Sequence, residues 1–460
     1  MTRLFAIAIA VSATLGACHR DRAPVDELAA KTAKLAASAP GMQVIIERGG
    51  TIVIDGNYGF ADLEHRVPVT RDSVFCIGSV SKQFGAAAVM QLVEEGKLSL
   101  DDVLATWLPA FPRADKITIR NLLQHTTGIV DFEYSGTWPE AMALERTTDE
   151  VIATFRDLPP LFEPGQQWSY SSSNYVLIGK VLESITGEPL AQLMKTRVFD
   201  RAGLAHTRFC DSYELIADRA RGYVRTKTGW APAPWSHLTQ FGLAGGICST
   251  AHDLLAWQHA LEEGKVVSAA SYEAMSTPGT TADGMPIHYG LGLAQLRLGN
   301  HRRIVHTGGV PGFGAILEHF PEDKLRIITL ANDRSVDVAH ELALGILNIP
   351  PPRAAPITPA QLAPYVVAVK DPAIGVARFL IDGDKLAIDA SGARIPLVHI
   401  GDGVFETADH RGRVRFEVTN GAVTRVMFAF DDAVFTLPPT TIAPPAAPPA
   451  QPEAEMGSGG

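Results

Sequence analysis

The sequence predicts an α/β chain in which an antiparallel sheet is flanked by helices and interrupted by an inserted helical domain, followed by a small C-terminal all-β domain. Short β-branched segments occur near residue 45 and again near residue 320, and the stretch between them is mainly helical or loop in character. After a proline-rich junction at residues 350–359, alternating apolar and polar residues replace the helical pattern. Strands on both sides of a helical stretch indicate one sheet assembled from distant parts of the chain.

Size and charge narrow the class of protein. A chain of 460 residues is too long for one ordinary domain. With 46% hydrophobic and 20% charged residues, it is too apolar to be disordered. The net charge of −10 argues against a nucleic-acid partner, because phosphate backbones are bound by a basic field. The sequence has neither a glycine-rich phosphate loop in a strand–turn–helix context nor paired metal-site spacing, so we expect no cofactor and no metal.

The first 17 residues have the pattern of an export signal. Arg3 is followed by an apolar run over residues 4–11 and by small residues directly before Cys18. The run is shorter than the roughly 20 apolar residues that span a bilayer. The ending LGAC resembles a bacterial lipobox, which implies cleavage before Cys18 and lipidation of that cysteine; ordinary cleavage beside an incidental cysteine is the alternative. We therefore expect a periplasm-facing membrane lipoprotein, and His19 favours the outer membrane.

The next elements are set by turn and cap residues. Residues 43–46 and 51–54, separated by two glycines, predict an antiparallel hairpin. A mostly apolar helix is expected over residues 79–95, ending at Gly96. Helices are also expected over residues 174–186, closed by Gly187, and from Thr250 to about residue 264.

The last third of the chain returns to strand patterns. Strands are expected over residues 315–320 and 325–330, followed by a helix over residues 336–347. In residues 360–438, Asn420-Gly421 separates two alternating apolar runs, which is a strong hairpin signal and predicts the small all-β domain. Residues 439–460 are rich in proline and alanine and are expected to be disordered.

Ser79 and Lys82 form the first candidate catalytic pair. They stand three residues apart at the start of the expected apolar helix, so their side chains share one face. A lysine whose pKa is lowered by burial can take a proton from a neighbouring serine and make it a nucleophile. The spacing alone is weak evidence, because a helix-capping serine beside a solvated lysine has the same pattern.

Five segments in order strengthen this hypothesis. Together they resemble the serine β-lactamase and penicillin-binding-protein superfamily, in its class C and DD-peptidase-like branch. The resemblance covers about residues 43–347 and implies a β-lactamase/DD-peptidase-like hydrolase domain at residues 25–349. The segments are FCIGSVSKQF (75–84), IRNLLQHTTGI (119–129), FEPG with WSYSS (162–172), GGICST (245–250) and HTGG (306–309).

The resemblance implies a role for each catalytic residue. Ser79 is expected to attack a carbonyl and form an acyl-enzyme that water hydrolyses. Lys82 and Tyr170 are expected to share the proton relay. The backbone N–H groups of Ser79 and Gly309 are expected to form the oxyanion hole.

The expected substrate-binding residues are Ser172, His306, Thr307 and Gly308, and two of them depart from the family pattern. Ser172 replaces the asparagine of the usual Tyr-x-Asn element; the nearby Asn174 is interpreted as a helix cap. His306 stands where class C β-lactamases carry lysine, and a neutral imidazole attracts a substrate carboxylate less strongly than an ammonium group does.

The expected function is therefore that of a serine hydrolase which cleaves an amide or ester bond in a D-amino-acid peptide, a muropeptide or an ester. The resemblance implies an enzyme of the DD-carboxypeptidase, D-aminopeptidase or esterase type. The expected partners are a small-molecule or peptide substrate and the membrane, which the protein would contact through its lipid anchor. A β-lactamase proper is one alternative, and a catalytically inactive envelope-tethered binding protein is another.

Cys210 and Cys248 are able to pair in an exported chain, but the sequence does not decide whether they do. Cys76 is expected to be a buried small hydrophobe.

Overall fold

The computed structural model describes residues 22–135, 142–335, 337–371, 375–390, 393–430 and 433–440. The export signal, Cys18 and the tail beyond residue 440 lie outside the described residues. Within these ranges, no helix has both the length and the apolar character needed to cross a bilayer.

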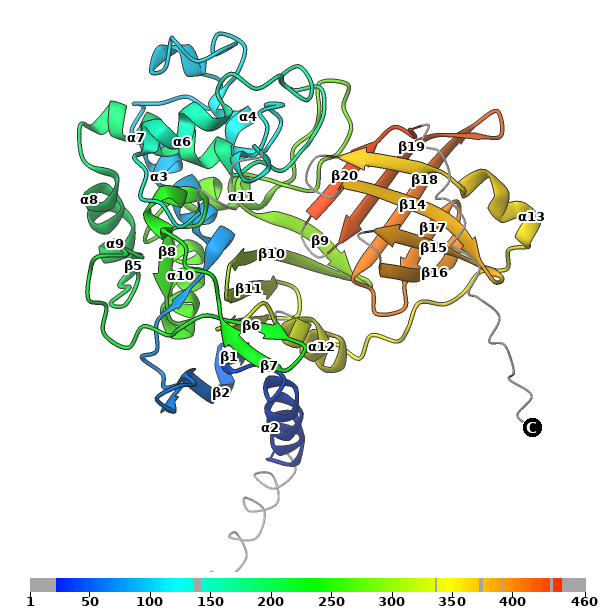
Figure 1. The fold of residues 1–460 in the computed structure, drawn as a ribbon, viewed down its shortest axis with the longest axis horizontal. Helices are drawn as coiled ribbons and strands as arrows, with labels where there is room; N and C mark the ends of the chain where they lie inside the picture. Colours follow the sequence, from blue (N-terminus) through cyan, green and yellow to red (C-terminus); the bar gives the residue numbers. More distant parts are fainter. Residues whose placement is uncertain are drawn as a thin grey trace, which may run out of the picture.

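A seven-stranded antiparallel sheet forms the centre of the larger domain (Figure 1). Its order is β3-β2-β1-β12-β11-β10-β9, so β1 near the start of the domain pairs with β12 near its end, in a register that runs from Met42↔Ala331 to Arg48↔Leu325. This pairing confirms the prediction of one sheet built from distant segments. The strands are β1 Gly41–Arg48, β2 Thr51–Asp62, β3 Val67–Pro68, β9 Ala294–Leu298, β10 His301–Val310, β11 Phe313–Phe320 and β12 Leu325–Ala331.

Helices cover both faces of this sheet, which explains why β1 is buried along almost its whole length. Ile45 joins the apolar core beneath α3 (Ser81–Glu94) and α10 (Ala251–Glu262). Val44 and Ile46 point the other way, into the core shared with α2 (Arg22–Ala36) and α12 (Asp337–Ile346). Alternate residues of one strand therefore serve two separate cores.

The inserted region is mainly helical, as predicted, and two of its helices have the predicted ends. Gly187 ends α7 (Ser173–Thr186) in the left-handed conformation, and the Thr250 side chain accepts the backbone N–H of Asp253 at the start of α10. The other helices are α4 Ile119–Leu123, α6 Thr148–Phe155, α8 Leu190–Met194, α9 Asp200–Ala202 and α11 Ala269–Ser276.

Short strands also lie in this region, and the sequence did not predict them. β4 (Phe75–Cys76), β8 (Ile247–Ser249) and β5 (Arg208–Phe209) form a small sheet, and β6 (Tyr223–Thr226) pairs with β7 (Gly229–Pro232). Segments of two to four residues are too short to show a periodic apolar pattern.

The C-terminal domain is an eight-stranded antiparallel sheet in simple sequence order, and it confirms the predicted all-β fold. A bridge between Ala368 and Thr440 brings its two edges together, so the sheet is nearly closed into a barrel. Aromatic side chains, including Phe379, Phe405 and Phe416, pack edge to face in its interior. The strands are β13 Ala368–Asp371, β14 Gly375–Asp382, β15 Lys385–Ala390, β16 Ala393–Gly401, β17 Val404–Thr407, β18 Gly412–Thr419, β19 Ala422–Phe430 and β20 Ala433–Leu437.

Candidate active site

Ser79 lies in a tight turn between a strand and the central helix. The 3₁₀ turn Gly78–Val80 connects β4 to α3, so the serine precedes the helix instead of lying within it as predicted. Gly78 has φ of +50°, and a Cβ at this position would lie 2.5 Å from the backbone nitrogen of Gly309. Glycine therefore allows the turn to approach β10 closely.

Lys82 is placed to hold the Ser79 hydroxyl. Its Nζ donates to Ser79 Oγ at 3.0 Å and to the Ala244 carbonyl oxygen at 2.7 Å. The side chain is completely buried, and Nζ lies 4.8 Å from the centre of the Tyr170 ring. The structure thus brings the predicted residues Ser79, Lys82 and Tyr170 together, from the 3₁₀ turn, from α3 and from the loop that precedes α7.

The Tyr170 loop is supported by His125. The two rings are 4.3 Å apart between centroids, and His125 Nδ1 accepts the backbone N–H of Ser171 at 3.2 Å. Burial, together with the positive charges of Lys82 and His306, lowers the pKa of His125 well below its usual value. His125 is therefore neutral near pH 7, and its ring orients the loop that carries Tyr170.

The edge of β10 forms the opposite wall of the site. Within the described residues, β9 pairs with β10 only as far as Val305, so no strand covers residues 306–310 on that side. A Cβ on Gly308 would collide with the Ile77 carbonyl oxygen, and it would lie 3.1 Å from the Ser79 nitrogen. The two glycines of the HTGG segment thus bring the predicted oxyanion donors, the N–H groups of Ser79 and Gly309, to one place.

His306 is buried behind this edge. Its Nδ1 donates to the Thr307 carbonyl oxygen at 2.6 Å, and Nε2 lies 2.8 Å from the Tyr289 hydroxyl. Only 1% of the residue is exposed. Direct contact of His306, Thr307 and Gly308 with substrate stays a prediction, and both ring nitrogens of His306 have protein partners.

Ser172 occupies the cap position of α7, and the interpretation of Asn174 as the cap was wrong. Ser172 donates its backbone N–H to Asp131 Oδ2 at 2.7 Å, and its hydroxyl also hydrogen-bonds with the acidic groups nearby. Asn174 lies inside the first turn, where Oδ1 accepts from Thr127 Oγ1 at 2.8 Å. The structure explains this difference, because the segment after residue 125 packs on α7 and buries the amide.

Asp131 and Glu133 were not singled out from the sequence, yet both interact electrostatically with Lys82. Burial and the charge of Asp131 raise the pKa of Glu133 to about 7, while the positive charges of Lys82 and Arg334 oppose this rise. Burial also raises the pKa of Asp131. One carboxyl group with a pKa near neutral pH, that of Glu133, therefore interacts with Lys82.

Arg334 is a third residue that the sequence did not reveal. It follows β12, is exposed, and its guanidinium would lie 2.8 Å from a Cβ placed on Gly309. The segment around it carries no motif, so only the pairing of β12 with β11 brings this charge beside β10.

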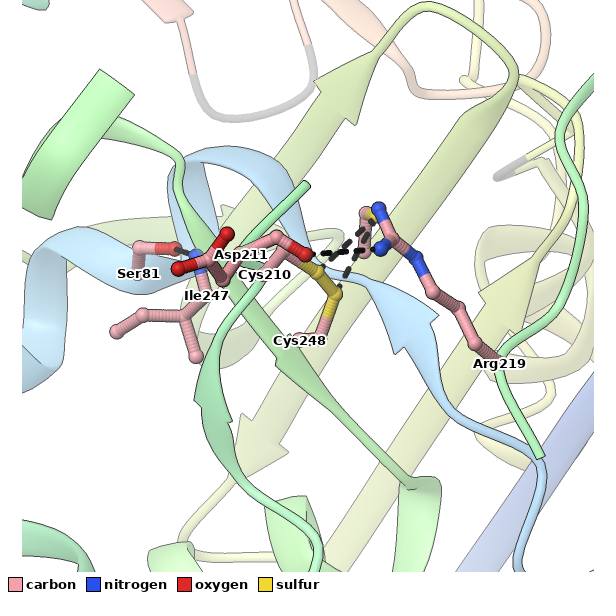
Figure 2. Close-up of a disulfide and its surroundings, with 7 residues drawn as sticks. Ser81, Cys210, Asp211, Arg219, Ile247 and Cys248 are labelled. Carbon is pink, nitrogen blue, oxygen red and sulfur yellow. Dashed lines mark hydrogen bonds between the residues drawn. A yellow bond between two sulfur atoms is a disulfide. The ribbon is translucent and has the colours of Figure 1, made fainter. Parts of the chain in front are cut away.

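The three described cysteines cluster beneath the nucleophile turn. Cys210, directly after β5, and Cys248 in β8 form a disulfide (Figure 2). Cys76 Sγ lies 3.4 Å from each of these sulfurs, and burial raises the pKa of its thiol to about 12, with Arg219 opposing the rise. The prediction that Cys76 is buried is confirmed.

These cysteines are the one cluster of three metal-ligand side chains found among the described residues. The disulfide occupies two of the three sulfurs, which leaves Cys76 as a single thiol. Metal coordination by proteins uses several deprotonated ligands, so this cluster in its bonded form does not make a metal site.

Comparison with known proteins gives a consistent result. A family model described as Beta-lactamase matches residues 26–347. The chain is 34% identical over 310 residues to PbpX, named as a penicillin-binding protein, of Bacillus subtilis (strain 168), covering 66% of this chain and 72% of that protein. It is 30% identical over 315 residues to a D-aminopeptidase of Brucella anthropi, covering 67% of this chain and 59% of that enzyme.

A solved structure also resembles both domains together. The octameric penicillin-binding protein homologue from Pyrococcus abyssi aligns with a TM-score of 0.62 over 91% of this chain and 99% of its own. Its sequence identity is 24%, so this likeness concerns the fold.

Proposed function

The chain belongs to the Beta-lactamase family, and on that premise we propose that it hydrolyses amide bonds of D-amino-acid peptides through an acyl-enzyme on Ser79. The observation that carries the proposal is the 3.0 Å contact between Lys82 Nζ and Ser79 Oγ, made by a lysine with no exposed surface. Burial of the lysine disfavours its charged form and suits it to accept the serine proton.

The proposed reaction assigns one step to each of these groups. Ser79 Oγ bonds to the substrate carbonyl carbon while its proton passes to Lys82, and the carbonyl oxygen becomes an oxyanion beside the N–H groups of Ser79 and Gly309. The proton then passes through the Lys82–Tyr170 relay to the leaving amine as the C–N bond breaks. A water molecule hydrolyses the resulting ester, and the proton that it loses restores the Ser79 hydroxyl.

The preference for peptide substrates rests on charge beside the reacting carbonyl. His306 has protein partners at both ring nitrogens, whereas the exposed guanidinium of Arg334 stands against Gly309. A substrate lying along the uncovered edge of β10 would present a carboxylate to Arg334, which binds such a group through two N–H donors. Relatives named D-aminopeptidase and penicillin-binding protein support an amide substrate.

Covalent labelling tests the nucleophile. Purified wild-type protein and Ser79→Ala are incubated with a fluorescent penicillin and a fluorophosphonate, and then assayed with D-Ala-D-Ala peptides, D-alanine p-nitroanilide, p-nitrophenyl esters and nitrocefin. We expect label on wild type only, fastest turnover of the D-amino-acid amides, and less than about a thousandth of that turnover in the variant. A wild-type protein that takes no label and turns over no substrate would be a binding protein, and the proposal would be wrong.

We also propose that the protein faces the periplasm and is held at the membrane by lipid on Cys18, as the signal-like sequence of residues 1–18 indicates. Cys18→Ser should move the protein from the membrane fraction to the soluble periplasmic fraction, whereas Cys76→Ser, which keeps the leader intact, should leave it at the membrane. Equal membrane association of all three proteins would contradict this location.

A further inference from the structure

A cleft between the two domains is lined by an unusual number of arginines. It has a volume of about 650 Å³ and lies between β9 and β10 of the hydrolase domain and β17 to β19 of the barrel. Its walls carry six arginines, in a chain whose net charge is −10. They are Arg297, Arg302, Arg303, Arg411, Arg413 and Arg415.

Three of these arginines have carboxylate partners. Arg302 lies 2.8 Å from Glu322, Arg303 pairs with the buried Glu318, and Arg411 lies 2.6 Å from Asp337. Their charges are therefore compensated within the protein.

The other three form no salt bridge with any described residue. In the described part of the chain, no carboxylate lies within salt-bridge distance of Arg297, Arg413 or Arg415, and all three are exposed. Arg297 donates to the Asn300 carbonyl oxygen, and Glu406 stands opposite Arg413 in the β17–β18 register. The two glutamates that line the cleft have basic partners of their own: Glu406 lies 3.0 Å from His410, and Glu417 lies 3.4 Å from Arg425. Among the described residues, the cleft thus presents three guanidinium groups that are not held in a salt bridge.

The backbone explains why these charges converge. Residues of β18 alternate, so Val414 and Phe416 fill the barrel while Arg413 and Arg415 point outward. Arg297 projects from β9, across the cleft. Burial and the charge of Arg413 lower the pKa of His288, which also lines the cleft.

We propose that this cleft binds a small organic molecule with a diphosphate group. Three guanidinium groups match the roughly three negative charges that a diphosphate carries near pH 7, and each guanidinium donates two parallel hydrogen bonds to phosphate oxygens. Leu296 and Met427, both partly exposed, line the same cleft and offer an apolar surface for the body of the ligand. A volume of 650 Å³ is within the range of sites for small organic ligands.

The cleft is connected to the catalytic site through one segment. Met285 and Pro286 line both this cleft and a second hollow that reaches Trp168, two residues before Tyr170. Tyr289, next to His288, bonds with His306 on β10. The proposed anion site is nevertheless separate from Ser79, so it does not depend on the proposed hydrolysis.

Calorimetric titration of the full chain with inorganic pyrophosphate at 0.15 M salt tests the proposal. We expect saturable binding with a Kd below about 1 mM, and at least a tenfold loss of affinity in Arg413→Gln/Arg415→Gln. Arg297→Gln, in the other domain, should also weaken binding, because both walls contribute. Arg394→Gln is the control: it removes an exposed arginine of the same barrel that pairs with Asp382 at 3.7 Å, and its affinity should stay within twofold of wild type.

The outcomes separate this site from the catalytic one. Ser79→Ala should bind pyrophosphate like wild type, and the arginine variants should still take the covalent label on Ser79, which also shows that they fold. Binding to phosphatidylcholine vesicles, with and without phosphatidic acid, distinguishes a soluble phosphate ligand from a lipid headgroup. If the ligand is a headgroup, wild type should bind the vesicles that contain phosphatidic acid and the Arg413/Arg415 variant should not; if the ligand is soluble, the two proteins should bind vesicles equally. The proposal would be overturned if pyrophosphate did not bind wild type saturably. It would also be overturned if the double variant and Arg297→Gln both bound pyrophosphate with the same affinity as wild type.

Discussion

Gly78 and Gly309 are in such close contact that a single methyl group on Gly78 would come within 2.5 Å of the Gly309 nitrogen. This contact joins the nucleophile turn to the strand edge that carries the second oxyanion donor. The relative position of the two donors therefore depends on the absence of a side chain.

Gly78→Ala should lower kcat by at least about 100-fold, because one oxyanion donor is displaced. Gly50→Ala is a matched control: Gly50 also has positive φ, +80°, but a Cβ there meets nothing within 4 Å. Both variants should lose about 1 kcal/mol of stability from the positive φ, Gly78→Ala should lose more because of the collision with Gly309, and only Gly78→Ala should lose activity. Steady-state kinetics and thermal melts measure the two effects; similar activities in the two variants would contradict the role of this contact.

Lys82→Ala and Tyr170→Phe should each reduce the acylation rate strongly, and the double variant should be little worse than the slower single variant. The reason is that Lys82 Nζ lies over the Tyr170 ring, and both groups serve one proton relay. Rates of covalent labelling under single-turnover conditions provide the measurement. Losses that multiply in the double variant would show two independent roles.

Glu133→Gln should stabilise the protein more at pH 8 than at pH 5. The pKa of Glu133 is raised to about 7 in the fold, above the unfolded value of about 4.5, so its contribution to stability is complete below pH 4.5 and is lost as the pH rises through 7. The glutamine cannot ionise, and its advantage at pH 8 should be about 1–3 kcal/mol in the free energy of unfolding. Glu163→Gln, at a carboxylate with half of its side chain exposed, is the control and should show no such pH dependence. Urea unfolding at both pH values decides the matter.

Loss of the Cys210–Cys248 disulfide should lower the free energy of unfolding by about 2–4 kcal/mol, since the bond closes a loop of 38 residues. Cys210→Ser/Cys248→Ser should melt at a lower temperature than wild type and should not respond to a reductant. Cys76→Ala should keep the wild-type response to the reductant. An unchanged wild-type melting temperature under reducing conditions would show that the bond does not stabilise the fold.

Removal of the barrel by truncation after residue 350 should change peptide preference more than ester hydrolysis. The barrel residues Arg425 and Leu437 line a hollow of about 600 Å³ together with Trp168, close to the catalytic tyrosine. Small esters should still be cleaved, and kcat/KM should change among longer peptides. Unchanged kcat/KM for both substrate classes would make the barrel a spacer, and a truncated chain that does not fold would show that it covers an apolar face of the hydrolase domain.

The sequence by itself determined the local elements and the candidate catalytic groups. Turn glycines, helix caps and alternating apolar residues act over a few positions, so the first hairpin, the end of α7 at Gly187 and the Asn420-Gly421 turn of the barrel were predictable. Ser79, Lys82 and Tyr170 were identified because five motifs occur in a fixed order, and the structure places them together.

Tertiary structure alone decided which distant groups share an environment. Asp131, Glu133 and Arg334 carry no motif, and they reach Lys82 or Gly309 only because α7 packs over the site and β12 pairs with β11. The burial of Asn174 and the bonding of Cys210 to Cys248 likewise depend on segments far apart in the chain. The physical reason is that turns and caps follow from local backbone preference, whereas burial, pKa shifts and uncompensated charge depend on long-range packing that no local pattern records.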